Sequence, residues 1–327
     1  MHDVIIIGAG PAGLSVAIEA QKAGLKYCVI EKGGIVNSIQ HFPTEMSFFS
    51  TPELLEIGGL PFTSAQMRPT RAEGLEYYAR VADFYKLEMK LFEKVLSVSK
   101  NNSDFIIETN KGKYQSKNVV LAIGYYDNPN RLNIPGEELP KVSHFYTEPY
   151  SFYRQNVLII GAKNSAAIAA LELFRHGAKV TLVHRGEKLS EKIKYWILPD
   201  IENRIREGSV AAYFNTIVEE ILSDKVRLRQ NEKVLEIPND FVFAMTGYHP
   251  DYSFLQSAGI TLDEEAAAPI YNPETLETNV KGLYVAGSVV AGKNNNKIFI
   301  ENGRLHGKEI VKAIIRTLNC TNETGPS

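Results

Sequence analysis

Cysteine is nearly absent from this sequence of 327 residues, which contains only Cys28 and Cys320. Two cysteines cannot form the disulfide framework of a small secreted domain, and no Cys/His spacing among the seven histidines matches a metal motif. The sequence also lacks an apolar run of about eighteen or more residues that would cross a bilayer, and residues 1–4 lack the cationic start of a secretion signal. We therefore expect a cytoplasmic protein with no metal site and no membrane contact.

The sequence also lacks a large excess of charge of either sign. It contains 36 Lys and Arg residues and 38 Asp and Glu residues, which give a formal net charge of −2. A chain without a basic surplus is unsuited to a nucleic-acid backbone or an anionic membrane, so we expect neither partner. The content of hydrophobic residues, 44%, is that of an ordinary globular protein, and the length corresponds to about two domains.

The first feature that is present is a glycine turn between an apolar strand at residues 4–7 and a helix expected over residues 14–23. In such a turn Gly8 permits a tight bend, Gly10 lets the backbone approach a pyrophosphate, and Gly13 lets the helix pack closely on the strand. The helix N-terminus adds unpaired N–H groups and a partial positive charge. This pattern predicts a dinucleotide site.

Glu31 completes that pattern, because it ends the second strand, Tyr27–Ile30, at the distance where a carboxylate accepts from ribose hydroxyls. On these residues alone, FAD and NAD fit equally well.

An aromatic-rich segment follows at residues 41–62, with two open interpretations, wrapping a flavin ring or capping a core. A helix is expected over residues 71–86 and a three-stranded meander near residues 91–98, 105–109 and 114–116. A separate buried strand, Asn118–Gly124, should end beside the first cofactor.

The opening pattern is repeated at residues 156–166, where a strand leads into Gly161, a helix over 166–176 and a strand over 179–183. An internal repeat of this kind indicates two nucleotide-binding units. Residues 125–154, rich in Asn, Pro and Tyr, are expected to cross between domains.

The second unit differs from the first in two ways. His184 and Arg185 stand where the first unit has Glu31 and a lysine, and a guanidinium that clamps phosphate favours NADPH over NADH. The alternative is that Arg185 is a solvated surface residue. Lys163 replaces the middle glycine, and its side chain either crowds a pyrophosphate or adds a cation to it.

Towards the C-terminus we expect strands at residues 226–228 and 241–244, and a buried strand at 282–288 that ends in glycine. A helix is expected to begin near Ile298 and to offer its N–H groups to an electron-rich ring edge. Residues 319–327 are too polar to pack and are expected to fray.

The order of these motifs resembles that of the two-domain flavoprotein reductases similar to low-molecular-weight thioredoxin reductase, and more closely the bacillithiol disulfide reductase family. The strings that carry the closer resemblance are Phe48-Phe49-Ser50, Lys163-Asn164-Ser165-Ala166, Trp196-Ile197-Leu198-Pro199, Phe243-Ala244-Met245, Gly247-Tyr248-His249-Pro250-Asp251-Tyr252 and Ile298-Phe299-Ile300-Glu301-Asn302-Gly303.

The resemblance implies an α/β fold of two Rossmann-like domains, with an NADPH domain inserted into an FAD domain. The implied parts are residues 1–124 and 253–327 for FAD, 155–244 for NADPH, and crossings at 125–154 and 245–252. Motifs and resemblance together assign FAD to Gly8, Gly10, Pro11, Ala12, Gly13, Glu31, Lys32, Thr44, Gly124, Gly287, Ser288 and Ile298. They assign NADPH to Gly161, Lys163, Asn164, Ser165, Ala166, His184 and Arg185.

One departure affects the chemistry. The better-known members of that family have a cysteine where this chain has Ala12, and the Cys-x-x-Cys of thioredoxin reductase is absent. Cys28, inside a strand, is expected to be buried, and Cys320 lies alone in the tail, so no catalytic side chain is identified. Ala12 marks either a branch with different acceptors or a substitution introduced into the chain.

The expected function is an NADPH-dependent FAD oxidoreductase that passes a hydride from NADPH to FAD and then reduces a small-molecule or small-protein acceptor. The resemblance implies a homo-oligomer and a low-molecular-weight thiol disulfide, such as bacillithiol disulfide, as acceptor. Competing interpretations are a ferredoxin or flavodoxin reductase, a flavin monooxygenase, and a non-catalytic redox sensor.

Overall fold

A computed structural model describes residues 1–294 and 297–323, and the chain forms two compact units. The first consists of Met1–His41, Glu45–Asn128 and Tyr248–Ser327, and the second of Phe42–Thr44 and Pro129–Gly247. The second unit is thus inserted into the first, and each contains a parallel sheet with helices. The expected fold class, one α/β unit inserted into another, is confirmed.

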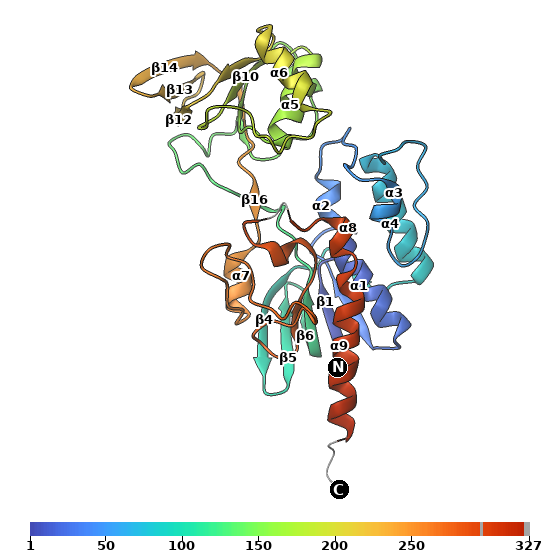
Figure 1. The fold of residues 1–327 in the computed structure, drawn as a ribbon. Helices are drawn as coiled ribbons and strands as arrows, with labels where there is room; N and C mark the ends of the chain where they lie inside the picture. The colour runs from blue at the N-terminus through green and yellow to red at the C-terminus, as the bar shows by residue number, and fades with distance from the viewer. Residues whose placement is uncertain (295–296, 324–327) are drawn as a thin grey trace. The chain divides into compact units, whose positions relative to one another are not determined.

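The first unit is built on a seven-stranded sheet (Figure 1). Its order is β3 (Met89–Lys90), β2 (Tyr27–Ile30), β1 (His2–Ile7), β6 (Lys113–Leu121), β5 (Asp104–Thr109) and β4 (Val95–Asn101), with β17 (Leu283–Val285) also paired to β6. β1, β2, β3, β6 and β17 run parallel, whereas β4, β5 and the first half of β6 form an antiparallel meander. The apolar residues of β1 and β2 are buried, as in parallel sheets that are covered on both faces.

β6 corrects the sequence-based expectation of two separate strands. Its first half pairs antiparallel with β5, and its second half pairs parallel with both β1 and β17. The polar residues in its middle suggested a break, but their side chains are satisfied inside the sheet. Ser116 donates to the carbonyl of Asn118 at 2.7 Å, and the Asn118 amide donates to the carbonyl of Asp3 at 3.0 Å.

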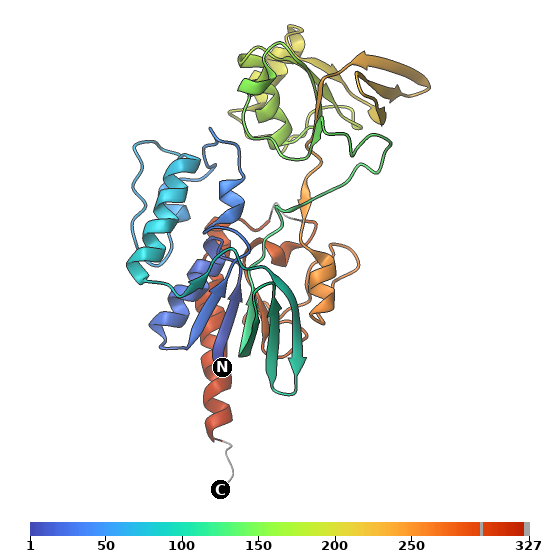
Figure 2. The same cartoon turned by 180° about the vertical axis from the view of Figure 1, so that it is seen from behind.

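Three long helices belong to this unit, namely α1 (Pro11–Lys22), α4 (Arg71–Tyr85) and α9 (His306–Glu323), besides the short α2 (Asn37–Gln40), α3 (Pro52–Leu55), α7 (Tyr252–Ser257) and α8 (Ile300–Gly303). A 3₁₀ turn, η2, spans Gly287–Ala291. α1 and α9 lie side by side in both views (Figures 1 and 2), and the Ser15 hydroxyl donates to the carbonyl of Arg304 at 2.5 Å.

The expectation that residues 319–327 fray is wrong for residues 319–323, whose backbone continues α9 to Glu323. The buried residues Ile310, Val311 and Ile314 hold the earlier turns against the unit, and the helix continues from them. Residues 324–327 lie outside the described part of the chain.

The aromatic-rich segment packs on α4. The ring of Phe62 stacks on Tyr77 with centroids 4.3 Å apart, and the hydroxyls of Tyr77 and Tyr78 donate to the carbonyls of Leu60 and Leu55, both at 2.9 Å. These contacts favour the core-capping interpretation for this part of the segment.

The second unit contains a five-stranded parallel sheet in the order β11 (Ala211–Tyr213), β10 (Lys179–Val183), β9 (Asn156–Ile160), β15 (Phe241–Ala244) and β8 (Val142–Ser143). Its helices are α5 (Asn164–Arg175) and α6 (Leu198–Arg206), and a 3₁₀ turn, η1, spans Tyr150–Phe152. β8 lies within the expected crossing, so that segment is partly built into the sheet.

An antiparallel sheet of β12 (Thr216–Ile221), β13 (Lys225–Gln230) and β14 (Lys233–Pro238) completes the second unit (Figure 2). The sequence indicated only β13. β14 is largely exposed, and charged pairs such as Lys225–Glu236 at 2.6 Å cover this sheet, so the hydrophobic alternation that marks a strand is weak.

The two connections between the units pair with each other, because β7 (Asn128–Pro129) bonds to β16 (Tyr248–His249). Over residues 1–294 and 297–323, no helix combines the length and apolar character needed to span a bilayer.

Candidate dinucleotide-binding sites

The carboxyl ends of the parallel strands of the first unit bring most of the predicted FAD residues to one edge. Gly8 follows β1 and donates its N–H to the carbonyl of Ile30 at the end of β2, at 2.9 Å. Ala122 follows β6 and donates to Ile7 at 2.8 Å, and Ala286 follows β17 and donates to Leu121 at 2.9 Å. This is the edge at which open parallel sheets bind ligands.

Two glycines of the first turn serve packing. Gly8 has φ +107°, and a Cβ there would lie 2.4 Å from the carbonyl oxygen of Ala122. A Cβ on Gly13 would lie 2.0 Å from the carbonyl oxygen of Gly8, so α1 rests directly on the turn. Both contacts exclude any side chain.

Gly10 is different. Its φ of −71° suits any residue, and nothing lies within 4 Å of the place where its Cβ would be. The fold therefore does not require glycine here, and the bare backbone is left open to close approach from outside the chain.

The N-terminus of α1 is not capped by a side chain. Its N-cap residue is Gly10, and Pro11 at the first helical position has no N–H to satisfy. By contrast, α4 begins with a capping box in which Thr70 and Glu73 exchange hydrogen bonds. The open first turn of α1, including Ala12, fits an anion such as a pyrophosphate.

Glu31 lies at the same edge and is 7% exposed. One carboxylate oxygen accepts from the N–H of Ala9 at 2.8 Å and the other from the N–H of Gly33 at 2.9 Å. Each oxygen can accept a second hydrogen bond, so the carboxylate is held in place and still able to receive a ribose hydroxyl. Lys32 instead forms an ion pair with Asp127 at 2.6 Å, and both side chains are partly exposed, so the pair contributes little stability.

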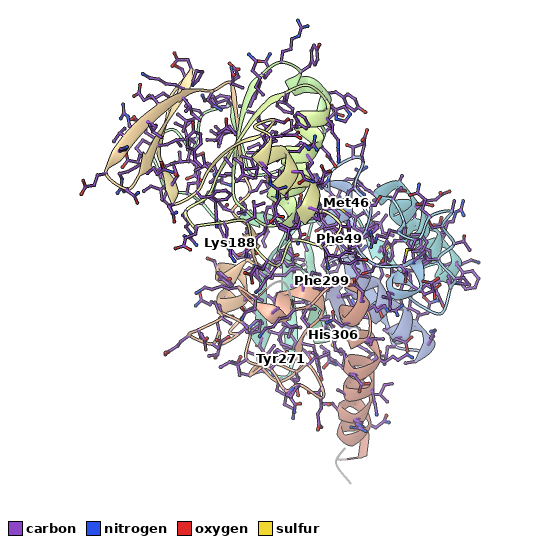
Figure 3. The ribbon with its side chains drawn as sticks, turned by 45° about the horizontal axis from the view of Figure 1, so that its top comes forward. Met46, Phe49, Lys188, Tyr271, Phe299 and His306 are labelled. Carbon is purple, nitrogen blue, oxygen red and sulfur yellow. The ribbon has the colours of Figure 1, made fainter. Side chains whose placement is uncertain are left out.

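Gly287 meets Ala12 at the centre of this edge. It has φ +75°, and a Cβ there would lie 2.7 Å from the Cβ of Ala12. Its N–H donates to Nδ1 of His306 at 3.1 Å, and burial lowers the pKa of His306. His306 (Figure 3) is a neighbour of the site that the sequence did not reveal, because the break between α8 and α9 that places its ring carries no sequence signal.

Of the remaining predicted FAD residues, some lie at the carboxyl edge of the first unit's sheet and one belongs to the second unit. Gly124 has φ +66°, and its missing Cβ faces the hydroxyl of Ser288 at 3.8 Å. Ile298 lies against Gly303, which packs on Gly287, so it also belongs to this edge. Thr44 donates its N–H to the carbonyl of Thr147 at 2.8 Å and is grouped with the second unit.

The helix expected to begin near Ile298 is α8, which starts at Ile300 and is only four residues long. A dipole needs several aligned turns, so this N-terminus is a weak anion site. Phe299 just before it is 50% exposed (Figure 3).

In the second unit, Gly161 and Lys163 form the corresponding turn. Gly161 has φ +141°, and a Cβ there would lie 2.6 Å from the carbonyl oxygen of Met245. Lys163 is the N-cap of α5 with an extended backbone, φ −110°, which a lysine adopts without strain. No side chain caps α5, and the side chain of Lys163 is exposed.

The predicted NADPH residues share one positive field. Burial lowers the pKa of His184, and the charges of Arg185 and Lys163 lower it further. Within residues 1–294 and 297–323, neither Arg185 nor Lys163 has a carboxylate at ion-pair distance, whereas Lys188 (Figure 3) pairs with Glu191 at 2.5 Å. An unpaired cation cluster beside a parallel sheet edge fits a phosphate group.

The other predicted NADPH residues have distinct surroundings. The Asn164 side chain donates to the carbonyl of Lys192 at 3.2 Å and accepts from the N–H of Lys194 at 2.9 Å, so it fixes the following loop. Ser165 is exposed at the start of α5, and Ala166 is buried in the core.

Cys28 offers no reactive thiol at these edges. Cys28 is fully buried on β2, and burial, with a smaller effect of Glu88, raises the pKa of its thiol to about 11. The side chain of Cys320 lies outside the described part of the chain.

Comparison with known proteins gives consistent results. The family model described as pyridine nucleotide-disulphide oxidoreductase matches residues 5–287. The chain is 46% identical over 317 residues to bacilliredoxin reductase Bdr of Bacillus subtilis (strain 168), covering 96% of this chain and 98% of that protein. Its fold is similar to the structure of bacillithiol disulfide reductase Bdr from Bacillus cereus, with TM-score 0.95, 45% identity and coverage of 97% and 99%. The corresponding structure from Staphylococcus aureus gives TM-score 0.94, 44% identity and coverage of 96% and 98%.

The neutral His306 ring predicts a pH dependence of stability. Because burial lowers its pKa in the folded state, the stability that it contributes is present above the unfolded pKa of about 6.5 and is lost as the pH falls through the lower folded value. Glutamine can accept the Gly287 N–H without titrating. When the pH is lowered from about 7.5 to about 5, we expect the free energy of unfolding to fall less in His306→Gln than in wild type. Equal losses in denaturant titrations at the two pH values would contradict this role.

Proposed function

The chain belongs to the pyridine nucleotide-disulphide oxidoreductase family and is an FAD-dependent oxidoreductase that uses NADPH, and we propose that its acceptor is the disulfide of a low-molecular-weight thiol such as bacillithiol. The expected enzyme class and both cofactors are confirmed by this membership. The observation that supports the acceptor is the near-full-length likeness to the Bacillus cereus enzyme, whose name states that substrate.

The first unit is the proposed FAD domain. The open backbone at Gly10 and the uncapped first turn of α1 suit the pyrophosphate, and the oriented carboxylate of Glu31 suits the adenosine ribose. The edge formed by Ala12, Gly287 and Ser288 is where the flavin ring and ribityl chain would lie. Thr44 is the weakest member of the predicted set, since its backbone bonds to Thr147.

The second unit is the proposed NADPH domain. Gly161 and the uncapped start of α5 suit the pyrophosphate, and Lys163 adds a cation to it rather than crowding it, because its side chain is exposed. Arg185, without an ion-pair partner among the described residues, suits the 2′-phosphate that separates NADPH from NADH.

When bound, the two cofactors supply the chemistry, in which a hydride equivalent passes from the nicotinamide to the flavin and then to the acceptor. The contribution of the chain is to bind, to orient and to exclude water. Ala12 offers no thiol at the edge where the family resemblance implies one, and Cys28 is fully buried. No side chain in the described part of the chain can therefore form a mixed disulfide with the acceptor.

That lack of a thiol favours a second candidate acceptor, a one-electron carrier protein such as ferredoxin or flavodoxin, which needs no protein thiol. Monooxygenase activity and a non-catalytic redox sensor are two further candidate functions, and each would give its own result in the reoxidation experiment that follows. A cytoplasmic location and a homo-oligomeric state are also proposed, on the low cysteine content and on the resemblance respectively.

The acceptor is tested by reducing the FAD-loaded protein with NADPH in the absence of oxygen and then mixing it separately with bacillithiol disulfide, ferredoxin, flavodoxin and oxygen. We expect bacillithiol disulfide to restore the flavin absorbance fastest. Fastest reoxidation by a carrier protein or by oxygen would overturn the proposed acceptor, and failure of NADPH to bleach the flavin would favour the sensor.

Ala12→Cys is the informative variant in the same assay, because it places a thiol beside Gly287. If a thiol at this edge takes part in reducing the acceptor, we expect Ala12→Cys to reduce bacillithiol disulfide faster than wild type. Flavin bleaching by NADPH should be unchanged. Ala12→Ser, of similar size without a thiol, is the matched control.

Gly10 and Gly13 form a matched pair for the FAD site. In FAD-free protein, Gly13→Ala should lower the unfolding free energy by about 1–3 kcal/mol, because its Cβ strikes the Gly8 carbonyl. Gly10→Ala should change it by less than about 1 kcal/mol. FAD titration should nevertheless show at least about tenfold weaker binding to Gly10→Ala, about 1.4 kcal/mol, because the methyl group occupies the pyrophosphate approach. Unchanged FAD affinity in this variant would remove Gly10 from the site.

Arg185→Gln should raise the KM for NADPH roughly 10- to 100-fold, since a charged hydrogen bond contributes about 1.5–3 kcal/mol. The KM for NADH should change little, because NADH has no 2′-phosphate. Lys188→Gln removes a nearby cation that is already paired with Glu191 and should leave both constants unchanged. Equal increases for NADPH and NADH in Arg185→Gln would exclude a 2′-phosphate contact.

A further inference from the structure

Three metal-binding side chains meet at the opposite edge of the first unit's sheet, where the parallel strands begin. His2 starts β1, Cys28 is the second residue of β2, and Glu88 immediately precedes β3. The pairing of Val29 with Met89, and the bond from the Val29 N–H to the carbonyl of Glu88 at 3.0 Å, set Glu88 beside Cys28. One donor atom from each of the three residues lies within 4.8 Å of the others.

These donors are of three kinds: a sulfur, an imidazole nitrogen and a carboxylate oxygen. Zn²⁺ accepts all three and prefers a tetrahedral shell with bond lengths of about 2.0–2.3 Å, which places the donors roughly 3.3–3.8 Å apart. The three donor atoms lie within 4.8 Å of one another, so the side chains of His2 and Glu88 move closer to Cys28 when the ion binds. A water molecule would complete the shell.

The ring of His2 lies beside the backbone of Gln115, which opposes the lowering of its pKa by burial. Histidines that bind a metal through one ring nitrogen commonly donate from the other to a backbone carbonyl, and the Gln115 backbone lies near enough for that role.

Other carboxylates near the cluster are committed elsewhere. One oxygen of Glu93 accepts from Thr109 at 2.6 Å and from Tyr114 at 2.7 Å. Asp3, beside His2, accepts the N–H of Lys26 at 3.0 Å. These bonds leave Glu88, which is exposed, as the carboxylate that can turn towards Cys28.

We propose that His2, Cys28 and Glu88 form a zinc site at the amino edge of β1, β2 and β3. On binding, a Zn–S bond forms, the Cys28 thiol releases its proton to solvent, and no redox change occurs. The thiolate and the carboxylate together balance the two charges of the ion. The ion enters past Glu88, ties three strands together and shields Cys28 from oxidation.

The zinc ligands lie away from the edge assigned to FAD, and the test of the site does not depend on the proposed acceptor. FAD-loaded protein without a polyhistidine tag is equilibrated with Zn²⁺, freed of unbound metal, and analysed for zinc per chain. We expect close to one zinc per chain. X-ray absorption at the zinc edge should show one sulfur ligand at about 2.3 Å with nitrogen and oxygen ligands at about 2.0–2.2 Å.

We expect at least about tenfold weaker zinc binding in each of three variants, Cys28→Ser, His2→Ala and Glu88→Gln. Replacing residues that only support the ligands of known metal sites already lowers affinity by about 10- to 100-fold. Cys320→Ser and His41→Ala are matched controls and should bind zinc like wild type. Flavin bleaching by NADPH should be unchanged in all five variants, which establishes that each is folded.

The proposal is overturned if folded wild type binds no zinc, if His2→Ala binds it as tightly as wild type, or if the absorption spectrum contains no sulfur ligand. Should Cys28→Ser fail to fold, the spectrum of wild type and the affinity of His2→Ala decide the question.

Discussion

The proposed FAD site depends on close contacts between backbone segments at the first glycine turn. Because Gly13 has no Cβ, α1 can rest on the carbonyl of Gly8, and Gly8 in turn fits under the carbonyl of Ala122 at the end of β6. These contacts direct the uncapped N-terminus of α1 to the carboxyl edge of the sheet, next to Glu31 and Gly287. Packing thereby creates an anion site without using a charged side chain.

The second unit repeats the packing but changes the charge. Gly161 fits against the carbonyl of Met245 much as Gly8 fits against Ala122. After the second strand, however, the first unit has a buried carboxylate held by two N–H groups. The second unit has His184 and Arg185 there, in one positive field with Lys163 of its glycine turn. The same fold can therefore select a ribose with free hydroxyls in one copy and a phosphorylated ribose in the other.

The sequence predicted the parallel strands and the two glycine turns, because apolar runs and glycines leave a strong local signal. It implied the inserted arrangement only through the family resemblance. It divided β6 in two, since it could not show that Ser116 and Asn118 find hydrogen-bond partners inside the sheet. It missed β12, β14 and α6, and it missed His306, whose place depends on the break between α8 and α9. Likewise, His2, Cys28 and Glu88 meet only through strand pairing, which no spacing rule detects.

We propose that the two copies bind different dinucleotides according to the residue that follows the second strand. A crystal structure of the protein with FAD and NADP⁺ would test this proposal. We predict the FAD pyrophosphate at the N–H groups of Ala12 and Gly13, its adenosine ribose at Glu31, and the 2′-phosphate of NADP⁺ at Arg185. A nicotinamide dinucleotide at the turn of Gly8 to Gly13, or a 2′-phosphate remote from Arg185, would contradict this assignment of the two cofactors.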